Sequence, residues 1–271
     1  MSTVLGVDVG SRMTKAVVLD VEAAPGREIL GCGKVYTHFD LADAARRAAA
    51  AALEDAGRGA GEVAYLSATG YGRYQVADRD LQITEMTCHA RGAVELMPGV
   101  VSVIDVGAQN ARAIRLAPSG RVLQFRMNDK CASGAGRFVE RVAKALEIDL
   151  EEVSGLALRA EQPCEISSIC AVLAESEVIN HVTNGASIPD ILQGTHVSIS
   201  DRLASLVRQV GAEEPFALTG GVSRNEALVR ALEERLEMRV QRHPLAEYAG
   251  ALGAALLGRQ RLHARAHAVP T

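Results

Sequence analysis

The most regular feature of the chain is a repeated pattern of short apolar segments that stop at a glycine. Residues 4–10 read Val-Leu-Gly-Val-Asp-Val-Gly, and residues 14–20 form a second apolar segment directly after them. Residues 100–107 repeat the pattern as Val-Val-Ser-Val-Ile-Asp-Val-Gly, again followed by an apolar segment, at 111–116. Short apolar runs between glycine turns are typical of buried strands. The pattern therefore predicts two copies of one strand–turn–strand unit.

Strands alternate with helical stretches along the rest of the chain. The Ala-rich residues 42–56 have the length and propensity of a helix, and residues 62–68 are expected to form a strand before the turn Thr-Gly-Tyr-Gly. This alternation predicts an α/β fold. We expect further strands at 34–36, 122–127 and 216–221 (with its glycine turn), and helices after Cys131, at 150–156, after Cys170, and at 196–210, 225–236 and 248–260.

The duplicated unit predicts a protein of two lobes with a cleft between them. Asp8-Val-Gly10 and Asp105-Val-Gly107 end equivalent strands, and Pro98-Gly99 marks the expected boundary. We expect the first lobe to comprise residues 1–98 plus about 248–271. The second lobe, 99–247, carries the cysteines at positions 131 and 170.

Composition excludes several classes of function. The chain has 271 residues, 48% of them hydrophobic and 23% charged, as in ordinary globular proteins. Its formal charge of -4 offers no basic surface for nucleic acid. The longest apolar runs are too short to span a membrane, and no signal peptide is visible. We expect a cytoplasmic protein, in which five cysteines, an odd number, argue against a disulfide framework.

The two strand ends predict a nucleotide site. A glycine directly after a buried strand lets backbone N–H groups approach a phosphate, and an aspartate there can hold Mg2+ directly or through water. We expect Asp8 and Asp105 to face each other across the cleft and to act in catalysis with Gln109. The expected nucleotide contacts come from glycine loops and adjacent polar side chains: Gly10, Ser11, Lys15, Gly107, Gly134, Gly136, Gly220 and Gly221.

This order of loops resembles the superfamily of acetate and sugar kinases, heat-shock ATPases and actin. The resemblance implies a duplicated, ribonuclease-H-like α/β fold with the nucleotide in the cleft between the lobes. Neither the P-loop pattern GxxxxGK[ST] nor a strand followed by GxGxxG is present. The P-loop and dinucleotide-binding alternatives are therefore excluded.

Longer motifs narrow the resemblance to one branch. They run through nearly the whole chain: Gly6-Val-Asp-Val-Gly-Ser11, Ala68-Thr-Gly-Tyr-Gly-Arg73, Glu85-Met-Thr-Cys-His-Ala90, Ile104-Asp-Val-Gly-Ala-Gln109, Asn128-Asp-Lys-Cys-Ala-Ser-Gly-Ala-Gly-Arg-Phe138, Ile166-Ser-Ser-Ile-Cys-Ala-Val-Leu-Ala-Glu-Ser-Glu-Val178, Thr219-Gly-Gly-Val222 and Gly250-Ala-Leu-Gly-Ala-Ala255. These motifs resemble the ATP-dependent activators of 2-hydroxyacyl-CoA dehydratases and the ATPase subunits of benzoyl-CoA reductases. The two cysteine segments are highly specific to that family.

The resemblance implies a dimer with one shared [4Fe–4S] cluster, ligated by Cys131 and Cys170 from each subunit. Both cysteines open predicted helices, whose N-termini stabilise negative charge. ATP and Mg2+ would then drive delivery of a low-potential electron, taken from ferredoxin, to dehydratase or aromatic-reducing subunits. The other three cysteines, Cys32, Cys88 and Cys164, are interpreted as packing residues, and His89, His181 and His196 as structural or surface residues.

The chain departs from the family pattern at several positions. The usual Asp-Ile-Gly-Gly-Gln-Asp is here Asp105-Val-Gly-Ala-Gln-Asn110, Arg12 replaces a small hydroxyl residue, and Gly-Thr-Gly has become Gly134-Ala-Gly136. These changes suggest a specialised paralogue, so we expect the smaller ATPase subunit of a benzoyl-CoA reductase, paired with a larger paralogue. The alternative is a homodimeric activator of a 2-hydroxyacyl-CoA dehydratase.

Two functions of other classes stay open. A small-molecule kinase of the same superfamily would need a general base in the cleft and would contain no iron. A scaffold or ATP sensor would bind nucleotide without turnover and would also lack iron. A brown, oxygen-sensitive preparation would exclude both.

Overall fold

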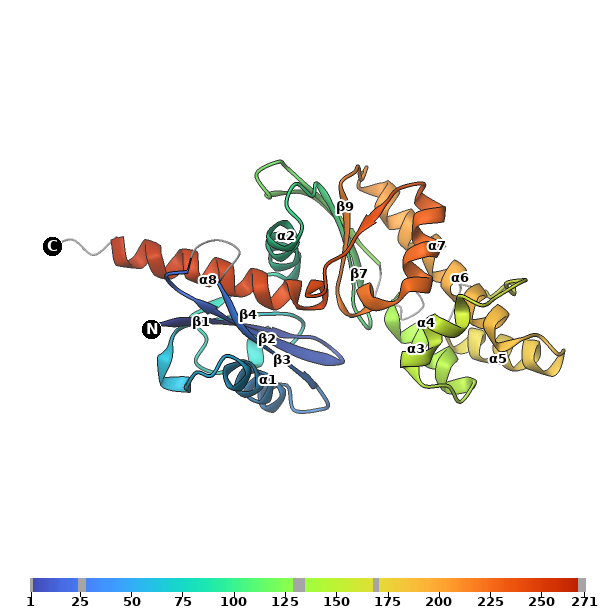
Figure 1. Ribbon diagram of the computed structural model, residues 1–271, viewed down its shortest axis with the longest axis horizontal. Coiled ribbons are helices and arrows are strands. Elements are labelled where there is room, and N and C mark those ends of the chain that lie inside the picture. Colours follow the sequence, from blue (N-terminus) through green and yellow to red (C-terminus); the bar gives the residue numbers. More distant parts are fainter. Residues whose placement is uncertain (1, 24–27, 129–134, 168–170, 268–271) are drawn as a thin grey trace. The chain divides into compact units, whose positions relative to one another are not determined.

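The computed structural model describes residues 2–23, 28–128, 135–167 and 171–267. The chain divides into two compact units, each built around a five-stranded sheet (Figure 1). Unit 1 comprises Met1–Gly99, Ala117–Val122 and Leu245–Thr271, and unit 2 comprises Val100–Leu116 and Leu123–Pro244. In the described parts of the chain, no helix is both long enough and apolar enough to cross a membrane.

The sheet of unit 1 has the strand order β3-β2-β1-β4-β5. β1 lies antiparallel to β2 and parallel to β4. Because side chains alternate between the two faces of a strand, β1 packs Leu5, Val7 and Val9 against α1, whereas Val4 packs against α8 on the opposite face (Figure 1). The elements are β1 Thr3–Val9, β2 Met13–Asp20, β3 Ile29–Tyr36, α1 Leu41–Asp55, β4 Val63–Thr69, β5 Leu81–Gln82, α2 Glu85–Leu96 and α8 Ala249–His267.

Small residues let α8 approach its neighbours closely. A Cβ atom at Gly6 of β1 would overlap the carbonyl oxygen of Ala251, and one at Gly92 of α2 would overlap that of Ala249. A Cβ atom at Gly253 of α8 would in turn overlap the carbonyl of Cys88. Close backbone approach of this kind requires glycine. Unit 1 therefore packs several of its elements backbone to backbone, without large aromatic side chains between them.

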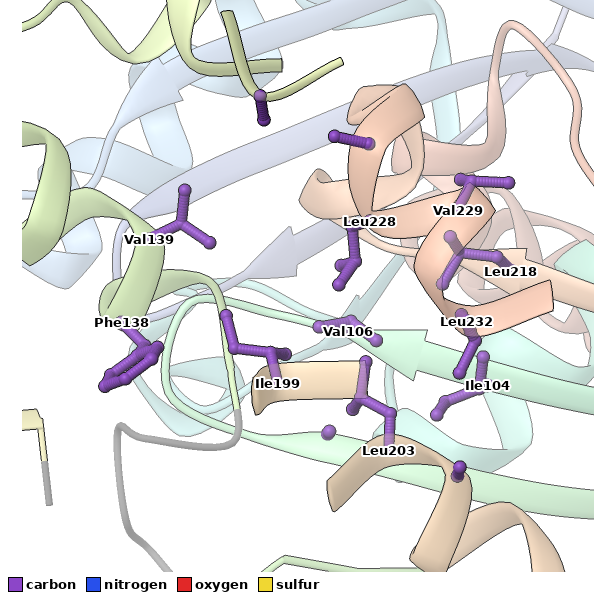
Figure 2. Packing of buried hydrophobic residues seen from close by; sticks show 14 of the residues in the cluster. Ile104, Val106, Phe138, Val139, Ile199, Leu203, Leu218, Leu228, Val229 and Leu232 are labelled. Carbon is purple, nitrogen blue, oxygen red and sulfur yellow. The ribbon is translucent and has the colours of Figure 1, made fainter. Parts of the chain in front are cut away.

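The sheet of unit 2 repeats the order of unit 1 as β10-β9-β6-β7-β8. β6 lies antiparallel to β7 and parallel to β9, as β1 does to β2 and β4. Ile104 and Val106 of β6 belong to a core that also contains residues of α3, α6 and α7 (Figure 2). The elements are β6 Ser102–Val106, β7 Ala111–Leu116, β8 Val122–Met127, α3 Gly136–Ala145, α4 Leu150–Ala157, α5 Ala171–Thr183, α6 Ile188–Gln209, β9 Phe216–Thr219, α7 Glu226–Leu236 and β10 Val240–Gln241.

Three predicted element boundaries were wrong, and one helix was not predicted. The last helix, expected to end at residue 260, continues to His267. The helix expected from residue 196 begins at Ile188, where the Ser187 hydroxyl accepts a hydrogen bond from the N–H of Asp190. Pro189 in the first turn is a second start signal that the apolar pattern alone does not carry. β3 begins at Ile29 instead of residue 34, and α2 occupies a segment to which no element had been assigned.

A buried histidine joins α6 to α7 inside unit 2. His196 is fully buried, with Nδ1 2.7 Å from the carbonyl oxygen of Leu192 and Nε2 2.9 Å from Nδ2 of Asn225. A carbonyl only accepts, so Nδ1 donates and Nε2 accepts from the amide. The same Asn225 accepts a hydrogen bond from the N–H of Leu228 and caps α7. Burial lowers the pKa of His196 to about 4, which keeps the ring neutral.

The buried histidine should make stability depend on pH. The unfolded chain binds a proton at position 196 at a pH where the folded chain does not, so the free energy of unfolding should fall as pH decreases from about 6.5 toward about 4. The full loss is about 3 kcal/mol. Urea unfolding at about pH 7 and about pH 5 should show about 2 kcal/mol of this loss in the wild type and a smaller loss in His196→Gln.

The matched control is His263→Gln, because His263 is exposed. This variant should keep the pH dependence of the wild type. Identical pH slopes in His196→Gln and in the wild type would show that other groups cause the acid destabilisation.

Candidate functional site

The predicted residue Asp8 lies at the end of β1 in a row of polar side chains. Asp8 pairs with Lys15 on β2 and with Thr69 on β4, and Lys15 pairs with Lys34 on β3. Directly paired residues project from the same face of a sheet. The row lies on the face covered by α8, and Asp8 itself is buried, with 7% of its surface exposed.

Two glycines and a histidine surround the Asp8 carboxylate. A Cβ atom at Gly70 would lie 2.5 Å from Oδ1, and one at Gly250 would lie 2.5 Å from Oδ2. Gly70 also has a φ of +92°, a conformation that residues with a side chain rarely adopt. Nε2 of the buried His89, on α2, lies 3.8 Å from Oδ2. The carboxylate is thus held by segments far apart in the sequence.

Lys15 is a buried cation on β2, opposite Asp8 in the strand register. Only 8% of its surface is exposed. Within the described parts of the chain, its ammonium group makes no hydrogen bond or ion pair, whereas Lys34 Nζ lies 2.9 Å from Oε2 of the buried Glu247. A largely buried ammonium group is costly unless an anion compensates it. Lys15 therefore has the properties of a binding group for an anion such as a phosphate.

The turn after β1 contains the next two predicted residues. The carbonyl oxygen of Gly10 accepts a hydrogen bond of 2.8 Å from the Thr37 hydroxyl. A Cβ atom at Gly10 would lie 2.7 Å from the carbonyl oxygen of Met13, so the tight turn needs glycine here. Ser11 is half-buried in the same turn. Gly10, Ser11 and Lys15 therefore all belong to the turn and strand that follow Asp8.

Unit 2 builds an equivalent arrangement around Asp105. This residue, 1% exposed, pairs with Arg112 on β7 and with Thr219 on β9. Gly220 has a φ of +89°, and a Cβ atom there would lie 2.6 Å from Oδ1 of Asp105. The other carboxylate oxygen, Oδ2, accepts a hydrogen bond of 2.8 Å from Arg112 Nη1. Space around a Cβ atom at the neighbouring Gly221 is open.

The turn after β6 is joined to the start of α3. The N–H groups of Gly136 and Arg137 each donate a hydrogen bond of 2.9 Å, to the carbonyl oxygens of Gly107 and Ala108. A Cβ atom at Gly136 would lie 3.0 Å from Val222, in the loop after β9. Three predicted loops of unit 2 therefore converge on Gly136.

The two polar residues at the tip of this turn, Gln109 and Asn110, differ in burial. Gln109 is exposed. Asn110 is half-buried, and among the described residues its Oδ1 atom has no hydrogen-bond partner. Its backbone carbonyl accepts a hydrogen bond of 2.8 Å from the N–H of Gly107 and closes the turn. The exposed amide of Gln109 is accessible to a ligand.

The structure adds residues that the sequence analysis missed. Arg112 occupies in unit 2 the register position that Lys15 occupies in unit 1. The signal was present in the sequence, because a cation follows each aspartate after seven residues. His89 had been interpreted as a structural or surface residue. It is buried beside Asp8, which no spacing within the sequence indicates.

The predicted cluster ligands Cys131 and Cys170 lie outside the described residues, as does Gly134. α5 begins at the residue that follows Cys170, and its Glu177 accepts a hydrogen bond of 2.6 Å from the N–H of Ser167. The other cysteines have protonated thiols at neutral pH. Burial raises the pKa of Cys32 to about 11 and that of Cys88 to about 12, and it also raises the pKa of Cys164.

Comparison with known proteins identifies the class of protein that this fold and site define. A sequence profile of the BadF/BadG/BcrA/BcrD ATPase family matches residues 5–258. The chain therefore belongs to this ATPase family, as the sequence motifs predicted.

Individual relatives extend over nearly the whole chain. The activator of lactoyl-CoA dehydratase from Anaerotignum propionicum is 42% identical over 252 residues, which cover 93% of this chain and 95% of the relative. A benzoyl-CoA reductase subunit from Thauera aromatica is 39% identical over 264 residues, covering 95% of this chain and 93% of the relative. The two kinds of protein named in the sequence analysis are thus both represented.

Solved structures confirm the predicted fold class. The activator of the 2-hydroxyisocaproyl-CoA dehydratase from Clostridium difficile with bound ADPNP has a TM-score of 0.92 and 34% identity, covering 99% of this chain and 98% of that one. A ROK family glucokinase from Streptomyces griseus has a TM-score of 0.58 at 18% identity, covering 96% and 100%. The second likeness shows the two-lobed α/β fold alone.

Gly250→Ala should destabilise the protein by about 1–3 kcal/mol. The added methyl group would lie 2.5 Å from Asp8 Oδ2 and 2.8 Å from His89 Nε2, so one of these buried side chains must move. The measurement is urea unfolding at neutral pH. The control is Gly155→Ala in α4, where a Cβ atom meets open space. That variant should be neutral or more stable by about 0.5–1 kcal/mol. A Gly250→Ala protein as stable as the wild type would contradict the steric argument.

Proposed function

We propose that this protein is an ATP-hydrolysing activator that delivers low-potential electrons to an acyl-CoA dehydratase. The observation that carries the proposal is the duplicated strand end, in which a buried aspartate lies between a left-handed glycine and a cation seven residues later. Two such ends in a member of an ATPase family support a site for one Mg2+–nucleotide complex. A relative solved with bound ADPNP supports the same conclusion.

The proposed roles follow from the chemistry of each group. Asp8 holds Mg2+ directly or through water, and Lys15 binds the phosphates that its buried ammonium group needs as counter-ions. Asp105 and Gln109 position the attacking water. Backbone N–H groups of the glycine loops at 10–11, 107, 134–136 and 220–221 approach the nucleotide. In this proposal both aspartates act on the same nucleotide.

A shared [4Fe–4S] cluster is the proposed redox group. It takes four thiolates, so two chains that each supply Cys131 and Cys170 provide a complete set. Burial raises the thiol pKa of Cys32, Cys88 and Cys164, which makes these three cysteines weaker candidates for thiolate ligands. When bound, the cluster supplies one-electron transfer, with ferredoxin as the proposed donor.

The proposed partner is a 2-hydroxyacyl-CoA dehydratase, not the aromatic-reducing subunits expected from the sequence. The benzoyl-CoA reductase interpretation is not favoured over a dehydratase activator, since relatives of both kinds match at similar identity. The reductase subunit is the second candidate, because Ala108 and Asn110 depart from the usual motif. The activator is expected to be a homodimer, and the reductase subunit to pair with a larger paralogue. Mass analysis of the complex isolated from its native source distinguishes them.

Lys15→Gln should weaken binding of Mg2+–ADPNP by at least about tenfold, because it removes the buried charge that compensates the phosphates. It should lower ATP turnover accordingly. Isothermal titration and a phosphate-release assay measure the two effects. The control is Lys144→Gln on α3, since Lys144 is exposed. Unchanged nucleotide affinity in Lys15→Gln would exclude this residue from the phosphate site.

Protein purified without oxygen should contain about four irons per dimer. Cys131→Ala and Cys170→Ala should each lose the iron and keep nucleotide binding, whereas Cys32→Ala should keep both. Iron and sulfide analysis with ADPNP titration gives both readouts. Wild-type protein that turns over ATP without iron would instead favour a kinase. ADPNP binding with neither turnover nor iron would favour an ATP sensor.

A further inference from the structure

The two aspartates of the duplicated strand ends have different ionic neighbours. Asp8 has His89 Nε2 at 3.8 Å, which is beyond hydrogen-bond distance. Asp105 has the Arg112 guanidinium at 2.8 Å. The register is otherwise repeated, with Lys15 opposite Asp8 and Arg112 opposite Asp105. The difference is therefore in the side chains and not in the backbone of the two halves.

The pair between Arg112 and Asp105 is buried and geometrically constrained. The two side chains are 9% and 2% exposed. One carboxylate oxygen faces Arg112, and the other lies against Gly220, where a Cβ atom would come within 2.6 Å. The guanidinium group stays charged at every pH at which the protein is folded. Asp105 is thus held in one orientation with its charge cancelled by a permanent partner.

We propose that Arg112 is a positioning residue that gives the two aspartates different tasks. By neutralising Asp105, it lets the negative phosphates approach the turn at Gly107. Asp8 has no cation at hydrogen-bond distance among the described residues, and its carboxylate is left for Mg2+. This inference rests on the proposed ATP site and deepens it. An arginine removed from a buried pair leaves an uncompensated carboxylate, which is strongly unfavourable. Next to a triphosphate, that carboxylate would also repel the ligand.

The proposal predicts a specific pattern among three variants. Arg112→Gln should weaken ADPNP binding by about tenfold or more, because Asp105 then carries a bare charge. Arg112→Lys keeps a cation and should bind within a few-fold of the wild type. The double variant Asp105→Asn with Arg112→Gln replaces the ion pair by two neutral amides. It should recover most of the binding, but not the turnover, since the oriented carboxylate is absent.

The experiment is titration of each variant with Mg2+–ADPNP, alongside ATP turnover and thermal melting. Arg115→Gln is the matched control. Arg115 lies on the same strand and pairs with Glu213 near the surface, so its loss should leave binding and turnover unchanged. Melting curves show whether each variant is folded. If Arg112→Gln does not fold, the lysine and double variants still test the proposal.

The outcomes distinguish failure of the proposed role of Arg112 from failure of the proposed ATP site. Wild-type binding in Arg112→Gln, or a double variant as weak as the single one, would overturn the charge-cancelling role and leave the ATP site intact. A wild-type protein that neither binds ADPNP nor hydrolyses ATP would overturn the proposed function, and the inference with it. Recovery of binding in the double variant would establish that the repulsive charge of Asp105 is what Arg112 removes.

Discussion

The structure depends on two buried carboxylates that each lie against the backbone of a glycine. At Gly70 and Gly220 the chain leaves β4 and β9 with positive φ, and a Cβ atom at these glycines would lie 2.5 Å and 2.6 Å from the aspartate beside each. This contact fixes where β4 ends relative to β1 and where β9 ends relative to β6. The candidate loops at 10–11 and 107–109 begin at the adjoining ends of β1 and β6. A side chain at either glycine would separate the loop from the sheet.

The sequence predicted the features that depend on local pattern. Strand–turn–strand units ending in Asp-Val-Gly predicted the central strands of both sheets, and the Ala-rich stretch predicted α1 within one residue at each end. The superfamily fold followed from the order of these glycine turns. Helix α2 was missed because its apolar residues are few and small, and it packs through Gly92 and Cys88 against α8.

Long-range neighbours could not be predicted in the same way. His89 reaches Asp8 from a helix about eighty residues later, and Gly250 reaches it from the last helix. His89 and Gly250 come together because the backbones of α2 and α8 pack closely. This packing produces no repeating pattern of apolar residues in the sequence. Arg112 differs, because the seven-residue interval from aspartate to cation occurs twice in the sequence. When the two strand pairs are aligned by register, this interval shows that Arg112 lies opposite Asp105 as Lys15 lies opposite Asp8.

The position of α8 has a consequence for how the protein is made. Val4 on β1 and Val17 on β2 are covered by residues of this last helix, so the sheet of unit 1 has one bare apolar face until α8 is synthesised. That face stays uncovered by α8 while the whole of unit 2 is translated, so unit 1 becomes complete only after α8 has been synthesised. Nascent chains with exposed apolar sheet surfaces are prone to aggregate and to recruit chaperones. Truncation within α8 would therefore damage the N-terminal sheet, although the two lie at opposite ends of the sequence.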